Sequence, residues 1–169
     1  GSVFRTSPDS VEVDEFCQAG IELIGQSGPS ADAEVIALTV ETLIAVGLRD
    51  FQIGVGCAGL LQGLLDAAGA RDSQREAVTL ALSERNYVNY MSIVNRSDWP
   101  ARSKEALLSL PSLHGGVDLL NALSPAVLGA KGSLAVDSLR AVLLEIEKTG
   151  LRQWVYVDPG MTRPFGYYT

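Results

Sequence analysis

The feature that most constrains the fold is a long helical stretch between short β-prone segments. From residue 57 to about residue 151, apolar side chains recur at three- and four-residue spacing, which is the period of an α-helix. The element order is strand, helix, strand, several helices, strand, strand. That order predicts an α+β fold in which a helical insertion, residues 57–151, rides on a mostly antiparallel sheet. Breaks between the helices are expected at residues 69–70, 98–100, 111–116 and 124–132.

Local patterns predict the remaining elements. Residues 15–24 carry β-branched and apolar residues without strict alternation, which favours a strand buried on both faces. A helix should begin near Ser30, which can cap it, and end at Gly47. The other expected elements are a strand at residues 51–55, a last helix at residues 133–149, a strand at residues 154–157, a turn at residues 158–160 and a return to β structure near Phe165.

Composition limits the class of protein. With 47% hydrophobic and 20% charged residues, the 169-residue chain has the balance of one soluble globular domain. No apolar run approaches the roughly 20 residues that a bilayer span requires, so we expect no membrane partner and a cytoplasmic location. The formal net charge of −7 leaves no excess of cations to bind a phosphate backbone, which argues against nucleic acid as a partner.

Several kinds of chemistry lack the residues that they need. Cys17 and Cys57 stand far apart, so they form neither a CxxC redox pair nor a zinc knuckle, and we expect two buried thiols. His114 is the only histidine, which excludes a two-histidine metal site. A Ser-His-Asp triad would have to use it alone, and the chain has no GxSxG motif. We therefore expect no metal site of these kinds and no catalytic triad, and the family resemblance described below implies neither a cofactor nor a catalytic residue.

A candidate ligand site lies on the strand expected at residues 15–24. Side chains two residues apart share a face of a strand, so Gln18 and Glu22 would flank Gly20, which leaves a depression without a side chain. A small ligand could lie there, with Glu22 accepting from an ammonium group and Gln18 offering its amide. Equally, this face could be exposed to solvent and the two side chains simply polar. Alternation alone does not separate the two interpretations.

Two arginines are candidates for holding an anionic group. Arg5 opens the first β-prone run, and Arg163 lies in a turn near Phe165, Tyr167 and Tyr168. A guanidinium group suits a carboxylate or a phosphate because it donates two parallel hydrogen bonds. Stacking of the arginine on an aromatic ring is the alternative at both positions.

Gly54, Gly56 and Gly59 match the letters of the dinucleotide-binding pattern GxGxxG. The pattern indicates a nucleotide site only where it opens a helix in a parallel βαβ unit. Because an antiparallel sheet is expected here, we interpret the match as accidental.

The two ends suggest an internal piece of a longer protein. Residues 1–2 look like the remnant of a cleaved tag, and β-prone runs stand directly after them and at the end of the chain.

Several segments resemble the histidyl-tRNA synthetase family, which includes a paralogue, the regulatory subunit of ATP phosphoribosyltransferase. EFCQAGIELIG (residues 15–25) followed by ADAEVI (residues 31–36) is similar to the second half of motif 2, and VFR (residues 3–5) resembles the strand that leads into it. LLSLPSLHGGVDLL (residues 107–120) is similar to part of the family's insertion. Residues 158–169 resemble the histidine-binding stretch usually written RGLDYYTG. The resemblance covers almost the whole chain.

The resemblance implies a class II aminoacyl-tRNA synthetase-like fold, an antiparallel sheet flanked by helices, with residues 3–169 as a partial catalytic core. It also implies roles for single residues. Gln18 and Glu22 of a QxGxE match, together with Arg163 and Tyr168, would line a histidine-binding pocket. Arg5 would stand where the synthetases bind the ATP phosphate, as a vestige of that site.

Departures from the family pattern favour the paralogue. Glu12 and Asp14 stand where cations are expected, and an anion beside a triphosphate opposes ATP binding. The late motif, RPFGYY from Arg163, lacks the usual aspartate. The resemblance thus implies a non-catalytic regulatory subunit in the first step of histidine biosynthesis.

Such a subunit would bind histidine, activate the short form of the ATP phosphoribosyltransferase catalytic subunit and associate with itself. Two alternatives stay open: the catalytic core of a divergent histidine-tRNA ligase, and a synthetase-like paralogue with an unrelated binding role.

Overall fold

The computed structural model describes residues 1–6, 13–121 and 123–162. Most of that part of the chain is helical, and its strands are short. In chain order the elements are β1 (Ser2–Thr6), β2 (Val13–Cys17), α1 (Pro29–Ala45), β3 (Ile53–Val55), α2 (Ala58–Ala67), α3 (Asp72–Ser83), α4 (Tyr87–Arg96), α5 (Ala101–Ser109), the 3₁₀ turns η1 (Leu110–Ser112) and η2 (Val117–Asn121), α6 (Pro125–Lys148), the 3₁₀ turn η3 (Arg152–Trp154) and β4 (Val155–Val157).

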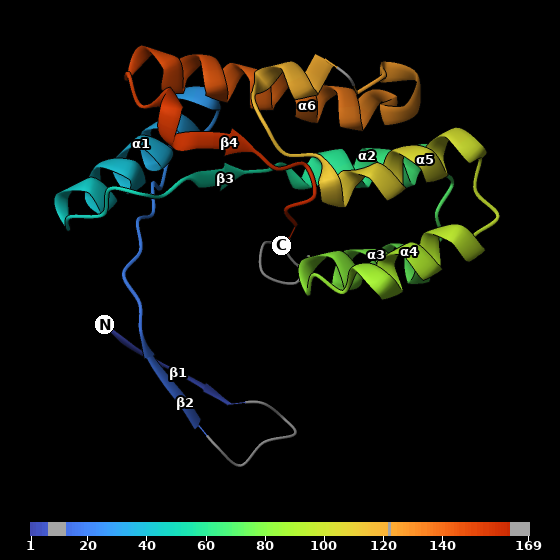
Figure 1. Cartoon of the computed structure of the whole chain (residues 1–169), viewed down its shortest axis with the longest axis horizontal. Helices are drawn as coiled ribbons and strands as arrows, with labels where there is room; N and C mark the ends of the chain where they lie inside the picture. The colour runs from blue at the N-terminus through green and yellow to red at the C-terminus, as the bar shows by residue number, and fades with distance from the viewer. Residues whose placement is uncertain (7–12, 122, 163–169) are drawn as a thin grey trace.

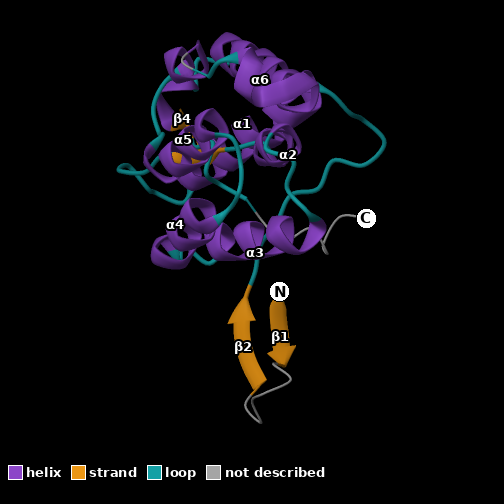
Figure 2. Ribbon diagram, turned by 90° about the vertical axis from the view of Figure 1, so that its right-hand side faces the viewer, coloured by secondary structure: helices purple, strands orange, loops and turns teal. Residues whose placement is uncertain are grey.

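The described strands form two separate pairs. β1 and β2 are antiparallel, whereas β3 and β4 are parallel, with Gly54 opposite Tyr156. Figures 1 and 2 both show the β1–β2 hairpin standing away from the helical body at the end of an extended linker. Among the residues that the structure describes, the body therefore does not contain the mostly antiparallel sheet that we expected. Its pair is parallel because the long helical stretch between β3 and β4 serves as the crossover that parallel strands require.

The strand expected at residues 15–24 is wrong beyond its first residues. β2 ends at Cys17, and one further pair of backbone hydrogen bonds joins Gly1 and Gln18 at 2.8 and 2.7 Å. Residues 19–24 then have no regular structure and, among the described residues, no partner strand. They are mostly exposed, Ile24 at 86%, and not buried on both faces. Because residues 19–24 have no neighbouring strand among the described residues, their backbone groups have no strand to pair with, and they do not form the buried strand that we expected.

The core is the layer between α2 and α6. Figure 1 shows α6 running along one side of the body, over α2 and the β3–β4 pair. The two helix backbones touch where Gly63 meets Gly132, because a Cβ atom on Gly63 would lie only 2.2 Å from the Gly132 backbone nitrogen. The buried side chains that α6 contributes to this layer recur at helical spacing: Val136, Leu139, Val142, Leu143 and Ile146.

α6 begins earlier than predicted. It starts at Pro125 and not near residue 133, and Gly129 (φ 63°, ψ −176°) interrupts its helical backbone. A positive φ combined with extended ψ is a conformation that essentially only glycine adopts. The break that we expected at residues 124–132 therefore exists as this kink at Gly129, and the helix expected at residues 133–149 corresponds to the part of α6 that follows it and ends at Lys148.

α4 is fixed against α5 by a buried tyrosine. Tyr90 is fully buried, and its hydroxyl donates a hydrogen bond to the Leu107 backbone oxygen at 2.6 Å. Burial in this apolar contact raises the pKa of Tyr90 well above its usual value. The contact also places Tyr87, at the start of α4, on the rim of the pocket described below.

The two cysteines are not the buried pair that we predicted. Cys17 is the last residue of β2 and is exposed because the hairpin projects from the helical body. Cys57, which precedes α2, is half-buried. No helix in the described part of the chain is both long and apolar enough to cross a bilayer.

Candidate functional site

The residues predicted to form a histidine-like pocket do not meet among the described residues. Gln18 and Glu22 are exposed on the linker between β2 and α1, and no wall of a depression stands near Gly20, where an added Cβ atom would meet nothing within 4 Å. Arg163 and Tyr168 lie outside the described residues, as does the return to β structure near Phe165. Arg5 lies in β1, but its side chain is also outside the description. The histidine pocket therefore stays a prediction.

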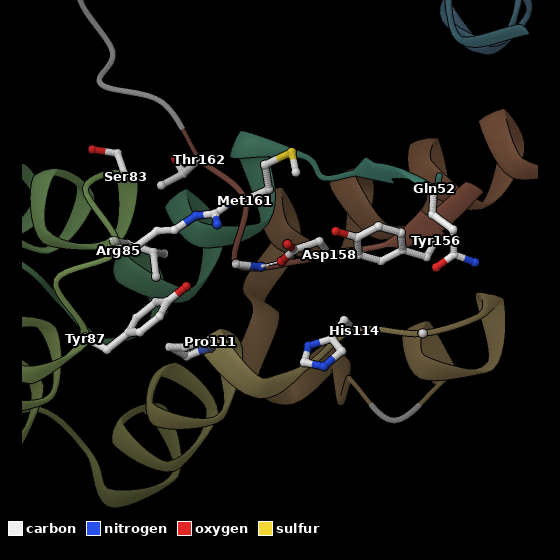
Figure 3. Close-up of a pocket in the computed structure, with 13 residues that line it drawn as sticks. Gln52, Ser83, Arg85, Tyr87, Pro111, His114, Tyr156, Asp158, Met161 and Thr162 are labelled. Carbon is white, nitrogen blue, oxygen red and sulfur yellow. Dashed lines mark hydrogen bonds between the residues drawn. The ribbon is translucent and has the colours of Figure 1, made fainter. Parts of the chain in front are cut away.

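The structure does form an open pocket of about 1080 Å³ from other residues. Four segments meet there: the residue before β3, the turn between α3 and α4, the segment from η1 into the loop that follows it, and β4 with the residues after it (Figure 3). None of its polar residues was singled out as a ligand-binding residue, although Asp158 and Thr162 lie in the segment that resembles the histidine-binding stretch, and His114 was considered only for catalysis. The polar side chains that line it are Gln52, Ser83, Arg85, Tyr87, His114, Tyr156, Asp158 and Thr162.

The β3–β4 pair builds one wall of this pocket. The Asp158 backbone nitrogen donates to the Val55 oxygen at 2.9 Å, which continues the strand pairing by one residue. Gly115 and Val157 exchange two backbone hydrogen bonds of 2.8 and 3.1 Å, and this bridge brings His114 beside the end of β4. The expected turn follows: Asp158 Oδ1 accepts from the Gly160 backbone nitrogen at 3.1 Å (dashed in Figure 3).

Two of the GxGxxG glycines, Gly54 and Gly56, lie in and directly after β3, where the chain approaches itself closely in the β3–β4 wall of the pocket. The pattern stands where β3 leads into α2, and β3 belongs to a parallel pair, so our reason for dismissing it was wrong. Even so, the chain itself fills the space that a nucleotide would need. A Cβ atom on Gly54 would lie 2.8 Å from the Tyr156 ring, and one on Gly56 would lie 2.6 Å from the Asp158 backbone oxygen. These glycines allow close approach of the chain to itself.

The break between α3 and α4 was missed in the sequence. Arg85 has φ 56°, and among the described residues it alone has a positive φ without being glycine. Its backbone nitrogen donates to Leu82 at 3.1 Å, and that of Asn86 donates to Ala81 at 2.8 Å, the helix-ending pattern that favours glycine at this position. The only signal was Asn86, whose side chain accepts from the Asn89 nitrogen and caps α4.

The pocket is rich in polar groups without internal partners. Arg85 and His114 are exposed to solvent, and within the described part of the chain no ion pair or side-chain hydrogen bond involves either of them. Thr162 Oγ1 is buried against the pocket and has no hydrogen-bond partner there. The described residues contain no group of three or more potential metal ligands. Such an arrangement is suited to holding a polar small molecule by hydrogen bonds.

Curated relatives align with almost the entire chain. ATP phosphoribosyltransferase regulatory subunits are 31% identical in Ruminiclostridium cellulolyticum, over 100% of this chain and 41% of the relative, and 34% identical in Desulfitobacterium hafniense, over 99% and 43%. The one from Bacillus subtilis is 36% identical, over 92% of this chain and 40% of the relative. The chain thus spans 40–43% of the length of these relatives.

Solved structures agree with the sequence relatives. A Bacillus halodurans protein described as an ATP phosphoribosyltransferase regulatory subunit/histidyl-tRNA synthetase matches with a TM-score of 0.85 and 29% identity, over 100% of this chain and 44% of that one. Histidyl-tRNA synthetase from Nostoc matches with a TM-score of 0.72 at 18% identity, over 85% and 36%, and shows a shared fold. The family model for histidyl-tRNA synthetase matches residues 1–169. The chain therefore belongs to the histidyl-tRNA synthetase family and has its class II synthetase-like fold.

Proposed function

We propose that the protein is a non-catalytic regulatory subunit of ATP phosphoribosyltransferase and acts in histidine biosynthesis. The observation that carries this proposal is the set of curated relatives with that name, which align with 92–100% of the chain at 31–36% identity. The charge pattern supports it. Glu12 and Asp14 stand where an ATP-binding member of the family would have cations, so the Coulomb term opposes a bound triphosphate.

The finer proposal is that the protein binds histidine through Gln18, Glu22, Arg163 and Tyr168, activates the short-form catalytic subunit and associates with itself. The exposure of the linker that carries Gln18 and Glu22 supports this, because both side chains are accessible to residues from beyond the described part of the chain. The backbone of residues 19–24 is also free to join a sheet there. Arg5 then remains as a vestige of the phosphate site.

The deciding experiment uses the protein at the length of its curated relatives together with the short catalytic subunit from the same source. We expect phosphoribosyl-ATP synthesis, or its sensitivity to histidine, only when both proteins are present, because a regulator acts by binding two states of its partner differently. Size-exclusion chromatography and steady-state kinetics over a range of histidine concentrations measure this. Two proteins that neither co-elute nor change each other's kinetics would refute the regulatory role.

Of the two alternatives, the histidine-tRNA ligase is the one that the description of the matching family model supports. The same preparation separates the two functions. Histidine-dependent exchange of pyrophosphate into ATP would establish the ligase in place of the regulator.

The histidine site has its own test. Glu22→Ala should weaken histidine binding by about 1.5 to 3 kcal/mol, the range for a hydrogen bond to a charged group. Glu34→Ala is the matched control, since it removes an exposed carboxylate from α1 outside the QxGxE match and should leave binding unchanged. Isothermal calorimetry gives both affinities. Equal affinity in the Glu22 variant and the unsubstituted protein would show that histidine binds elsewhere. The outcome of the experiment with the catalytic subunit would not depend on that result.

A further inference from the structure

We infer that the pocket of Figure 3 is a binding site for a small sugar phosphate: one phosphate monoester attached to a body that carries hydroxyl groups. None of Gln18, Glu22, Arg163 and Tyr168 lines the pocket, but Asp158 and Thr162 come from the segment that resembles the histidine-binding stretch, so histidine is included among the ligands tested below.

One end of the pocket suits the phosphate. Arg85, Tyr87 and Thr162 lie toward this end in Figure 3, and together they offer a guanidinium fork and two hydroxyl donors. A guanidinium group donates two parallel hydrogen bonds to a phosphate, and hydroxyl donors complete the shell around the remaining oxygens. Neither Arg85 nor Thr162 Oγ1 has a competing partner among the described residues.

The backbone at Arg85 points to a role for its side chain. A non-glycine residue in the left-handed region is strained, and glycine would fit this helix end without that strain. Strain of this kind concentrates at functional sites, where the surrounding structure maintains it. Here the strained turn is what directs the guanidinium group into the pocket (Figure 3).

The opposite end suits hydroxyl groups. Gln52, His114 and Asp158 supply hydrogen-bonding groups there, and Tyr156 adds an aromatic wall. The turn uses only Oδ1 of Asp158, so Oδ2 is available to accept from a ligand. A carboxylate repels a second phosphate group, which limits the ligand to one phosphate at the Arg85 end.

The site is tested on the chain itself with ribose 5-phosphate and glucose 6-phosphate as probes, and with inorganic phosphate, ribose and histidine for comparison. Calorimetry should detect at least one sugar phosphate binding at least tenfold more tightly than inorganic phosphate, and no binding of ribose. Arg85→Gly should weaken the sugar phosphate at least tenfold while raising the thermal unfolding midpoint. A structural role alone would not produce these opposite changes. Arg102→Ala, which removes an exposed arginine from α5, should change neither.

Asp158→Asn keeps the oxygen that accepts from Gly160, so it should weaken the sugar phosphate severalfold and leave inorganic phosphate unchanged or tighter. Four results would overturn the inference. They are no saturable binding of either sugar phosphate, equal binding by the Arg85 variant, inorganic phosphate binding as tightly as the sugar phosphates, and displacement of a bound sugar phosphate by histidine.

Discussion

Gly63→Ala is expected to lower the free energy of unfolding by about 3 kcal/mol or more, out of the roughly 5 to 15 kcal/mol that holds a domain of this size together. The added methyl group would lie 2.2 Å from the Gly132 nitrogen, 2.4 Å from the Gly132 Cα atom and 2.8 Å from the Leu128 oxygen. All three are backbone atoms, so no side chain can rotate away. The helices must separate, which opens the core layer between α2 and α6. Urea unfolding followed by circular dichroism measures the loss.

Two neighbouring glycines provide graded controls. Gly132→Ala meets the Leu128 side chain, at 3.0 Å from Cβ and 3.3 Å from Cδ2, which can shift in part, so its cost should be smaller. Gly59→Ala lies on the same helix as Gly63 but meets only side-chain atoms, the nearest being the Ala135 Cβ atom at 3.1 Å. Its gain in helix propensity of about 1 kcal/mol should offset most of that contact. Equal losses in all three variants would show that the crossing at Gly63 is no tighter than its surroundings.

Local periodicity was sufficient to predict α1 and the buried face of α6, although not every helix boundary. α1 and the buried stripe of α6 follow three- and four-residue spacing, and Gly47, with φ 94°, follows α1 as the helix-ending pattern predicts. Helix hydrogen bonds join residues four apart, so the sequence within a short window contains most of the required information. The turn at Arg85 escaped prediction because its backbone conformation normally calls for glycine, which is absent there.

Strand pairing could not be predicted in the same way. The parallel partner of β3 lies about a hundred residues further along the chain, and nothing in the pattern at residues 51–55 indicates the direction of that partner. The linker at residues 18–24 resembles a buried strand in composition, yet burial depends on a neighbour that the described residues do not supply. The family resemblance indicated Gln18 and Glu22 as ligand-binding residues, but it does not tell which other side chains lie next to them in this structure.

The pocket could not be predicted from the sequence for a related reason. Arg85, His114 and Asp158 come from three segments that only the tertiary fold brings together, and no spacing rule links them. Asp158 was correctly placed in a turn, but the turn pattern says nothing about what its carboxylate faces. A pocket of this kind becomes predictable only once the pairing of β3 with β4 is known.

Gly56→Ala should disturb both the fold and this pocket. The new methyl group would lie 2.6 Å from the Asp158 backbone oxygen, 2.9 Å from the Met161 Cβ atom and 3.0 Å from the Met161 backbone oxygen. Because the backbone after β4 must move away, the hydrogen bond from the Asp158 nitrogen to Val55 should weaken, and stability should fall by about 2 to 3 kcal/mol. Thermal and urea unfolding measure the stability, and calorimetry with the sugar phosphates reports the pocket.

The control for Gly56→Ala is Gly54→Ala, two residues earlier on β3. Its methyl group would press on the Tyr156 ring at 2.8 Å and the Met161 Cε atom at 3.0 Å, which are side-chain atoms that can move without shifting the turn. Its loss of stability should therefore be the smaller of the two, and the Asp158 turn should persist. If Gly54→Ala proved the more damaging substitution, the rigid point of the wall would be the Tyr156 ring and not the backbone turn after β4. The pocket would then depend on strand packing more than on the turn that holds Asp158.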